Sequence, residues 1–328
     1  MADPSHSSIR IILVIHLANH PSPTSMSGFE DFSHERVKVH SEALDRDLEI
    51  AAYKAGSGPG LLLLHGFPQT HYIWNKVANG LSEKYTVVAT DLRGYGASDK
   101  PKGSESHVEY SKREMANDQV QVMKHFGFDR FYIMAHDRGA RVAHRLALDH
   151  PDKVKKMILL DIAPTLWMYE HTSMEFATGY WHWFFLIQQT PGPEEMIMSG
   201  PEAFWGSLER RVTHSLVAWS DEAVAEYQQA FFKPETVHGA CEDYRAAATI
   251  DLVHDRADRD GGRKLRIPAL KVLWGKQGMI ERMGGAVEVF KGYCDESVEV
   301  SGRSVESGHY IPEEVPEDVL REATGFFV

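Results

Sequence analysis

An aspartate occupies the position of this chain that is best suited to nucleophilic chemistry. The segment Ala135–Arg141 reads AHDRGAR and joins a short apolar run to a stretch with helical spacing. Small residues lie two positions before and two positions after Asp137, as in the strand-to-helix turn G-x-S-x-G, where larger side chains would collide. An aspartate replaces the serine here, and its carboxylate can displace a leaving group from a saturated carbon and form an ester. The alternative interpretation is that Asp137 only caps the helix.

A second carboxylate and a histidine follow at the ends of later predicted strands. Asp161 comes directly after the apolar run 154–160, and His309 lies in a loop before the last predicted helix. A histidine held in one tautomer by a carboxylate can activate the water that opens an ester. Glu281 is the alternative acid, but the segment 275–279 carries no early carboxylate, so Asp161 is preferred.

Two arginines follow the aspartate at helical spacing. Arg138 and Arg141 are three residues apart, so both side chains can lie on one face of the helix. An arginine pair on a helix is ordinarily a solvated surface. Directly beside a nucleophile, however, two guanidinium groups favour a substrate that carries a carboxylate, and they help to keep Asp137 ionised.

Strands that alternate with helices must position these residues. Such alternation predicts a mostly parallel, doubly wound α/β sheet, whose carboxyl edge holds the ligand. A leading antiparallel hairpin is expected before it, with its turn at 56–60. The expected strands are 61–64, 85–90, 130–134, 154–160, 268–275 and 297–300, with helices at 112–126, after Asp137, and at 315–327.

The alternation stops between residues 165 and 258. This stretch is helical in character and rich in aromatic residues, so it is interpreted as a helical cap over the active edge. Residues 28–164 and 259–328 then form the core. Residues 1–27 are expected to be a flexible, dispensable extension rather than a signal peptide, because their apolar run is short and is followed by a poor cleavage site.

Several of these motifs occur together in one known group of enzymes. The chain carries HGFP at 65–68, the DRGAR elbow, DIAP at 161–164 and the pair Gly308-His309. Together they resemble the aspartate-nucleophile α/β-hydrolases, which include haloalkane dehalogenases and epoxide hydrolases. The motifs WHWFF at 181–185 and DYR at 243–245 resemble those of the fluoroacetate (haloacetate) dehalogenases.

The resemblance implies an α/β-hydrolase fold and a set of site residues. Asp137, Asp161 and His309 would be the catalytic residues, and Arg138 with Arg141 would bind the substrate carboxylate. Side-chain donors of three cap residues would bind the departing halide, and two backbone N–H groups would stabilise the oxyanion. The halide donors are His182, Trp183 and Tyr244, and the backbone groups are those of Phe67 and Arg138.

The amino-acid composition disfavours several classes of binding partner and cofactor. The net charge of −12 disfavours nucleic acid and anionic membranes. Two cysteines are too few for a disulfide framework and indicate a reducing, cytoplasmic location, and no histidine spacing indicates a metal site. We therefore expect no cofactor and no metal, a small carboxylate as substrate and, from the resemblance, a homodimer.

Two further functions stay open at this point. An epoxide hydrolase would use the same aspartate with two tyrosines, Tyr244 together with Tyr180 or Tyr169. The residue after Asp137 weighs against it, because epoxide hydrolases usually have tryptophan there and this chain has Arg138. A binding protein that has lost catalysis is the third interpretation, and the presence of all three catalytic residue types disfavours it.

Overall fold

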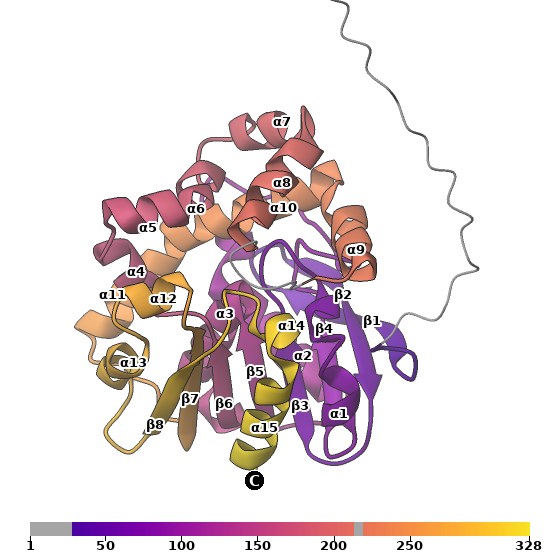
Figure 1. Cartoon of the computed structure of the whole chain (residues 1–328), viewed down its shortest axis with the longest axis vertical. Coiled ribbons are helices and arrows are strands. Elements are labelled where there is room, and N and C mark those ends of the chain that lie inside the picture. Colours follow the sequence, from indigo (N-terminus) through magenta and orange to yellow (C-terminus); the bar gives the residue numbers. More distant parts are fainter. Residues whose placement is uncertain (1–27, 213–218) are drawn as a thin grey trace, which may run out of the picture.

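One eight-stranded sheet forms the centre of the molecule, with helices on both faces and above its carboxyl edge (Figure 1). The computed structural model describes residues 28–212 and 219–328, so the predicted extension 1–27 lies outside the described residues. The strand order is β1-β2-β4-β3-β5-β6-β7-β8. The strands are β1 (Ser33–Ser41), β2 (Arg46–Ala55), β3 (Gly60–Leu64), β4 (Thr86–Thr90), β5 (Phe131–His136), β6 (Val154–Leu160), β7 (Ala269–Gly275) and β8 (Glu299–Val305).

Strand direction follows the predicted doubly wound pattern. β1 with β2 and β2 with β4 are antiparallel, and every other neighbouring pair is parallel. β3 lies near the middle, and its run of four leucines is fully buried, as a strand covered on both faces requires. The α/β prediction is therefore confirmed.

The predicted hairpin exists, but its turn was placed wrongly. The chain reverses at residues 42–45, where Asp45 has φ +50° and its N–H donates to the carbonyl of Glu42. Segment 56–59 instead carries the chain from β2 to β3, which do not pair because β4 lies between them. The glycines at 56 and 58 gave the stronger turn signal, but that signal says nothing about which strands become neighbours.

The last strand is longer than predicted. β8 runs to Val305 rather than ending near residue 300, and it pairs only with β7. Residues 301–304 are polar or small and lie partly in solvent at the edge of the sheet, so they lack the apolar pattern of a buried strand.

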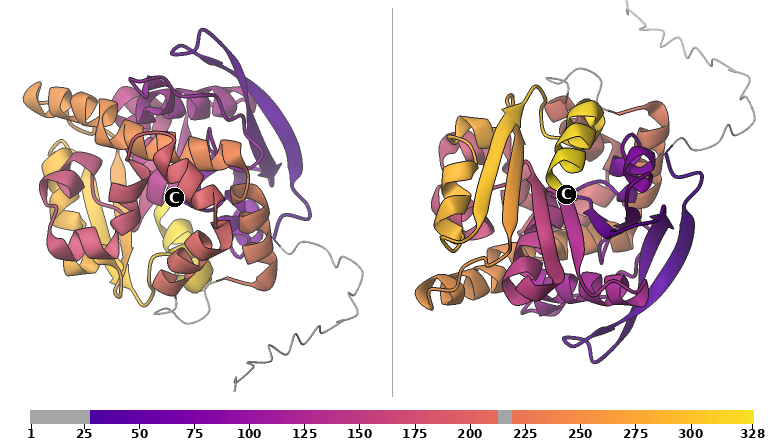
Figure 2. Two further views of the ribbon diagram at one scale, coloured as in Figure 1. Left: turned by 90° about the horizontal axis from the view of Figure 1, so that it is seen from above. Right: turned by 90° about the horizontal axis from the view of Figure 1, so that it is seen from below.

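The core helices cover both faces of the sheet (Figure 2). Helices α2 (Lys112–His125) and α3 (Asp137–Asp149) contact each other on one face, and α1 (Ala78–Ser82) and α15 (Pro316–Phe326) contact each other on the opposite face. The remaining core helices are short: η1 (His71–Trp74), η2 (Val108–Tyr110), η3 (Pro151–Lys153), α12 (Met279–Arg282), α13 (Val287–Tyr293) and α14 (Ile311–Glu314).

The described residues between β6 and β7 form eight helices, in the stretch that the sequence marks as helical. α5 to α10 lie above the carboxyl edge of the sheet (Figure 1). Asp137, Asp161 and His309 lie at the same edge, because they follow the ends of β5, β6 and β8. Within the described ranges, no helix has both the length and the apolar composition of a membrane span. The inserted helices are α4 (Thr165–Glu170), α5 (Met174–Gly179), α6 (Trp181–Leu186), α7 (Gly192–Met198), α8 (Pro201–Val212), α9 (Asp221–Phe231), α10 (Pro234–Ala248) and α11 (Ile250–Asp260).

Candidate active site

Asp137 lies at a strained turn between β5 and α3. Its φ is +46°, a left-handed conformation that non-glycine residues rarely adopt. The turn is held because the N–H of Gly139 donates to the carbonyl of His65 at 2.8 Å. A Cβ on Gly139 would lie 2.3 Å from that carbonyl oxygen, and a Cβ on Gly66 would lie 2.4 Å from the Cβ of Asp137. Both positions therefore require glycine, and such local strain is typical of functional sites.

The three predicted catalytic residues lie together at the carboxyl edge of the sheet. Nδ1 of His309 is 2.5 Å from Oδ2 of Asp161, and Nε2 of His309 is 3.8 Å from Oδ2 of Asp137. The second oxygen of Asp161 accepts from the N–H of Gly275 at 3.0 Å. The alternative acid Glu281 instead accepts from the indole N–H of Trp274. His309 therefore donates through Nδ1 and presents a free electron pair on Nε2 towards Asp137.

The carboxylate of Asp137 is buried but stays ionised. Burial by itself raises its pKa, but interactions with His309 and His136 and the positive charges of Arg138 and Arg141 outweigh burial, and the pKa lies below its usual range. An ionised carboxylate is the form that can act as a nucleophile.

The two oxygens of Asp137 have different surroundings. Oδ1 accepts a hydrogen bond from the backbone N–H of Phe67 at 3.0 Å, whereas Oδ2 faces His309. The predicted oxyanion donor Phe67 is thus in place at the carboxylate. Arg138, whose N–H is the second predicted donor, is the next residue in the first turn of α3.

Arg138 is paired with a residue of the inserted helices. Its Nε donates to Oδ2 of Asp243 at 2.8 Å, and its Nη2 donates to Oδ1 at 2.9 Å. Both side chains are completely buried. Nη1 of Arg138 has no partner among the described residues. Only this nitrogen is available for a ligand.

A second cation and a second carboxylate complete this buried cluster. Lys112 forms ion pairs with Asp243 and, at 3.4 Å, with Asp251. Tyr95 donates its hydroxyl to Asp243 at 2.7 Å. The cluster thus contains two positive side chains and two aspartates, whose charges cancel. The positive charge of Arg138 is therefore largely neutralised.

Arg141 differs from Arg138 in its partners. Its Nη1 donates to the carbonyl of Ala163 at 3.0 Å and to Oγ1 of Thr165 at 3.1 Å, and both acceptors are neutral. Its Nε is buried without a partner in the described part of the chain, and the side chain is nearly inaccessible. Burial and the neighbouring Arg138 lower its pKa, which is the signature of a cation without a bonded counter-ion.

The three predicted halide-binding side chains are buried and in mutual contact. The ring of Tyr244 lies 5.8 Å from that of His182 and 6.1 Å from that of Trp183, measured between centroids. The indole N–H of Trp183 is buried without a partner among the described residues. Arg141 lies 4.5 Å from the Trp183 ring and Arg138 lies 4.1 Å from the Tyr244 ring, so the predicted carboxylate and halide groups border one another.

Sequence reasoning missed several supporting residues. Asp243 was noted only as part of a motif, and Lys112 and Tyr95 were given no role at the site. His136 donates through Nε2 to the carbonyl of His309 at 2.8 Å. Burial lowers its pKa to about 3, so it stays neutral. No local sequence pattern predicts the roles of these residues, because their partners are distant in the chain.

No metal centre is formed by the described residues, which contain no group of three histidine, cysteine or carboxylate side chains able to hold an ion.

Several known proteins are similar to this chain in sequence and in fold. The α/β-hydrolase fold family matches residues 59–311. The chain is 40% identical over 294 residues to a fluoroacetate dehalogenase from Burkholderia sp, with 89% of this chain and 93% of the relative covered. It is 30% identical over 296 residues to a soluble epoxide hydrolase from Corynebacterium sp. (strain C12), with 88% and 97% covered.

A solved structure agrees with these matches. A crystal structure from Nostoc sp PCC 7120, described as an α/β hydrolase, superimposes with a TM-score of 0.84 at 46% identity and covers 92% of this chain and 99% of that one. The chain therefore belongs to the α/β-hydrolase family of enzymes, in the group that also contains fluoroacetate dehalogenase and epoxide hydrolase relatives.

Proposed function

We propose that this enzyme hydrolyses short 2-haloacids of the fluoroacetate type to 2-hydroxy acids through an aspartyl ester. The observation that carries the proposal is Arg141, a buried guanidinium beside the nucleophile that has no carboxylate partner within the described structure. A buried guanidinium without a bonded carboxylate is costly, and a substrate carboxylate would supply that bond. The 40% identity to a fluoroacetate dehalogenase supports the same substrate class.

The first step is displacement of the halide. Oδ2 of Asp137 is the attacking atom, because Oδ1 is held by the Phe67 N–H. Its electron pair forms a bond to the α-carbon while the carbon–halogen bond breaks, and the halide leaves with that bonding pair. The N–H of Trp183, with His182 and Tyr244, would solvate the halide, which matters most for fluoride, a poor leaving group.

The second step is hydrolysis of the ester. Nε2 of His309 accepts a proton from water as the water oxygen attacks Cγ of Asp137, and Asp161 stabilises the imidazolium that forms. Negative charge develops on Oδ1, where the Phe67 N–H already donates a hydrogen bond. The bond from Cγ to the former Oδ2 then breaks, and the 2-hydroxy acid leaves with the proton from His309. The second water proton remains on the Asp137 carboxyl group, which releases it to solvent and returns to the carboxylate.

An epoxide hydrolase is the second candidate. The identity to a soluble epoxide hydrolase favours it, and two tyrosines border His182, with ring centroids 5.6 Å away for Tyr180 and 5.8 Å away for Tyr244. Tyr180 is the better second tyrosine than Tyr169, since its ring also lies 6.1 Å from that of His309. Arg138 beside Asp137 weighs against this candidate, because epoxide hydrolases usually have tryptophan at that position.

Halide release decides between these functions. We expect fluoride or chloride release from fluoroacetate, chloroacetate and 2-chloropropionate, with little turnover of their methyl esters. Equal turnover of acids and esters would contradict the role of Arg141. Diol formation from styrene oxide without halide release would establish the epoxide hydrolase, and tight acid binding without any turnover would indicate a non-catalytic protein.

A further inference from the structure

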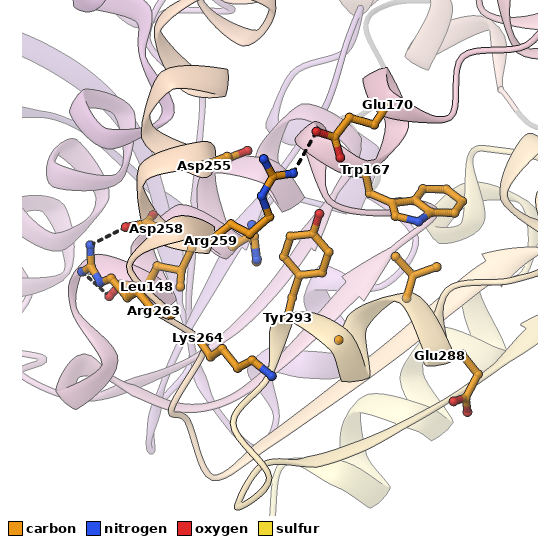
Figure 3. Close-up of a pocket in the computed structure, with 14 residues that line it drawn as sticks. Leu148, Trp167, Glu170, Asp255, Asp258, Arg259, Arg263, Lys264, Glu288 and Tyr293 are labelled. Carbon is orange, nitrogen blue, oxygen red and sulfur yellow. Dashed lines mark hydrogen bonds and ion pairs between the residues drawn. The ribbon is translucent and has the colours of Figure 1, made fainter.

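A cavity lies away from the catalytic residues, between the core and both ends of the inserted helices (Figure 3). Its volume is about 370 Å³. The core contributes walls from α3 and α13, and the insertion contributes walls from α4 and α11, its first and last helices. None of the three catalytic residues lines it.

Apolar and aromatic side chains form much of the wall. Leu148 of α3 and Val289 of α13 contribute aliphatic surface, and Trp167 of α4 contributes an indole. Tyr293 rises from α13 between Trp167 and Arg259 (Figure 3). A concave, mainly apolar cavity of this size with a few polar groups is typical of a small-molecule site.

Each of the four carboxylates that line the cavity already accepts a hydrogen bond from a cation, and Glu288 accepts from Lys291 at 2.7 Å. Asp255 and Asp258 accept hydrogen bonds from Arg145 at 2.6 Å and 2.5 Å. Glu170 accepts from Arg259 at 2.8 Å, the bond drawn across the upper wall in Figure 3.

Lys264 remains as the unpaired charge of the wall, since no carboxylate of residues 28–212 or 219–328 forms an ion pair with it. The wall carries four carboxylates and three cations, and Lys264 is the cation that can bind an anionic group without breaking an existing ion pair.

A buried histidine also lacks a partner. His144 lines the cavity, is 6% exposed, and its Nε2 has no hydrogen-bond partner in the described structure. Burial lowers the pKa of His144 to about 3, so the ring is neutral. Buried polar atoms are nearly always bonded, and an orphaned one at a cavity wall indicates a ligand or a water there.

We propose that this cavity binds a small aromatic carboxylate that carries a ring hydroxyl. The ring would pack between Trp167, Tyr293 and Leu148, the carboxylate would pair with Lys264, and the hydroxyl would bond to His144. Bound there, the ligand would contact α3 and α13 of the core together with α4 and α11, and it would stabilise their packing. The proposal concerns binding and is independent of the reaction at Asp137.

Gly292 provides a variant that fills the cavity. It lies in α13 at the cavity wall, and a Cβ added there has no atom within 4 Å, so Gly292→Phe introduces a ring without a backbone clash. Gly325 in α15 is a matched control, because it is also an exposed helical glycine with open space around its Cβ, and it lies outside the cavity.

Calorimetric titration of the full chain with 4-hydroxyphenylacetate tests the proposal. We expect saturable binding to the wild type and to Gly325→Phe, and loss of binding in Gly292→Phe. Lys264→Met is expected to weaken binding about threefold to fivefold, as for an exposed ion pair, and to make the acid and its neutral amide bind equally.

Binding that survives in Gly292→Phe would place the ligand elsewhere, including at Arg141, and would overturn the proposal. Absence of binding to the wild type would overturn it as well. Phenylacetate, which lacks the ring hydroxyl, is expected to bind more weakly than 4-hydroxyphenylacetate, and equal affinity would remove His144 from the site.

Discussion

Arg138 and Asp243 are joined by two parallel hydrogen bonds of 2.8 Å and 2.9 Å that link the first turn of α3 to helix α10 of the insertion. The pair aims the guanidinium and leaves Nη1 without a partner among the described residues. The two arginines that look equivalent in the sequence therefore have different functions in the proposed mechanism. Arg138 presents one oriented donor to the substrate, and Arg141 supplies the charge.

Replacing Asp243 is expected to destabilise the fold strongly. Asp243→Asn leaves Arg138 and Lys112 buried with one carboxylate fewer, and breaking such a pair costs about 3–5 kcal/mol in unfolding free energy. Tyr95→Phe removes only one hydrogen bond to the same carboxylate and should cost about 1 kcal/mol. Urea denaturation measures both, and equal losses would contradict the central position of Asp243.

Replacing His309 is expected to trap the ester. In His309→Asn the halide can still leave, but water is not activated, so turnover should fall by about 10²–10⁴. Mass spectrometry after incubation with chloroacetate should show the protein heavier by one carboxymethyl group. Asp137→Asn is the control and should show no adduct. An unmodified His309→Asn protein under single-turnover conditions would argue against covalent catalysis.

Trp183 is expected to contribute more to the rate with fluoroacetate than to the rate with chloroacetate. Trp183→Phe keeps an aromatic face for Arg141 but removes the unpaired indole N–H. A hydrogen bond to a charged group contributes about 1.5–3 kcal/mol, so the rate with fluoroacetate should fall about 10- to 100-fold, and less with chloroacetate. Trp181→Phe on the same helix is the matched control. A uniform effect on both substrates would indicate a packing role.

Glu314 is expected to position the loop that carries His309, the proposed base. Its carboxylate accepts hydrogen bonds from the N–H groups of Gly308 and Tyr310, which flank His309. Glu314→Gln can accept only one of these well, so kcat should fall about 5- to 10-fold with little change in KM. Glu317→Gln, an exposed change one turn further on, is the control. A change in KM alone would mean that Glu314 acts on substrate binding instead.

Glu313 is expected to make stability depend on pH. Burial raises its pKa to about 8, although hydrogen bonds from Tyr227, Gln69 and Asn75 oppose the rise. Between the ordinary pKa of glutamate and pH 8 the folded protein keeps a proton that the unfolded chain releases, so stability falls as pH rises through this range.

The proton-linked loss is at most about 5 kcal/mol at 1.36 kcal/mol per pKa unit. Glu313→Gln cannot ionise, and it can still bond to Gln69, whose Oε1 has no partner in the described structure. Its unfolding free energy, measured from pH 5 to pH 9, should therefore decline less than that of the wild type. Parallel curves would show that Glu313 does not carry a proton in this range.

Local sequence patterns predicted the α/β fold class, which the structure confirms, and named the candidate catalytic residues. Asp137 between small residues, followed by Asp161 and His309 at later strand ends, is a local signal, because the elbow requires Gly139 and because carboxyl ends of parallel strands meet at one edge. The strand at 154–160 matches β6, and α2 ends one residue before the predicted end. Apolar runs and turn residues carry this information within a few neighbouring positions.

The distribution of charge at the site depends on tertiary packing. The neutralisation of Arg138 by Asp243, 105 residues away, and the distance between His309 and Asp161, 148 residues apart, depend on how the inserted helices and the core pack. The position of the hairpin turn and the pairing of the edge strand β8 also depend on tertiary packing, because the residues of these segments do not indicate which strands lie beside them. Ion pairing weakens over a few ångströms in space and produces no periodic pattern along the chain, so folding determines which of the two arginines is paired with a carboxylate.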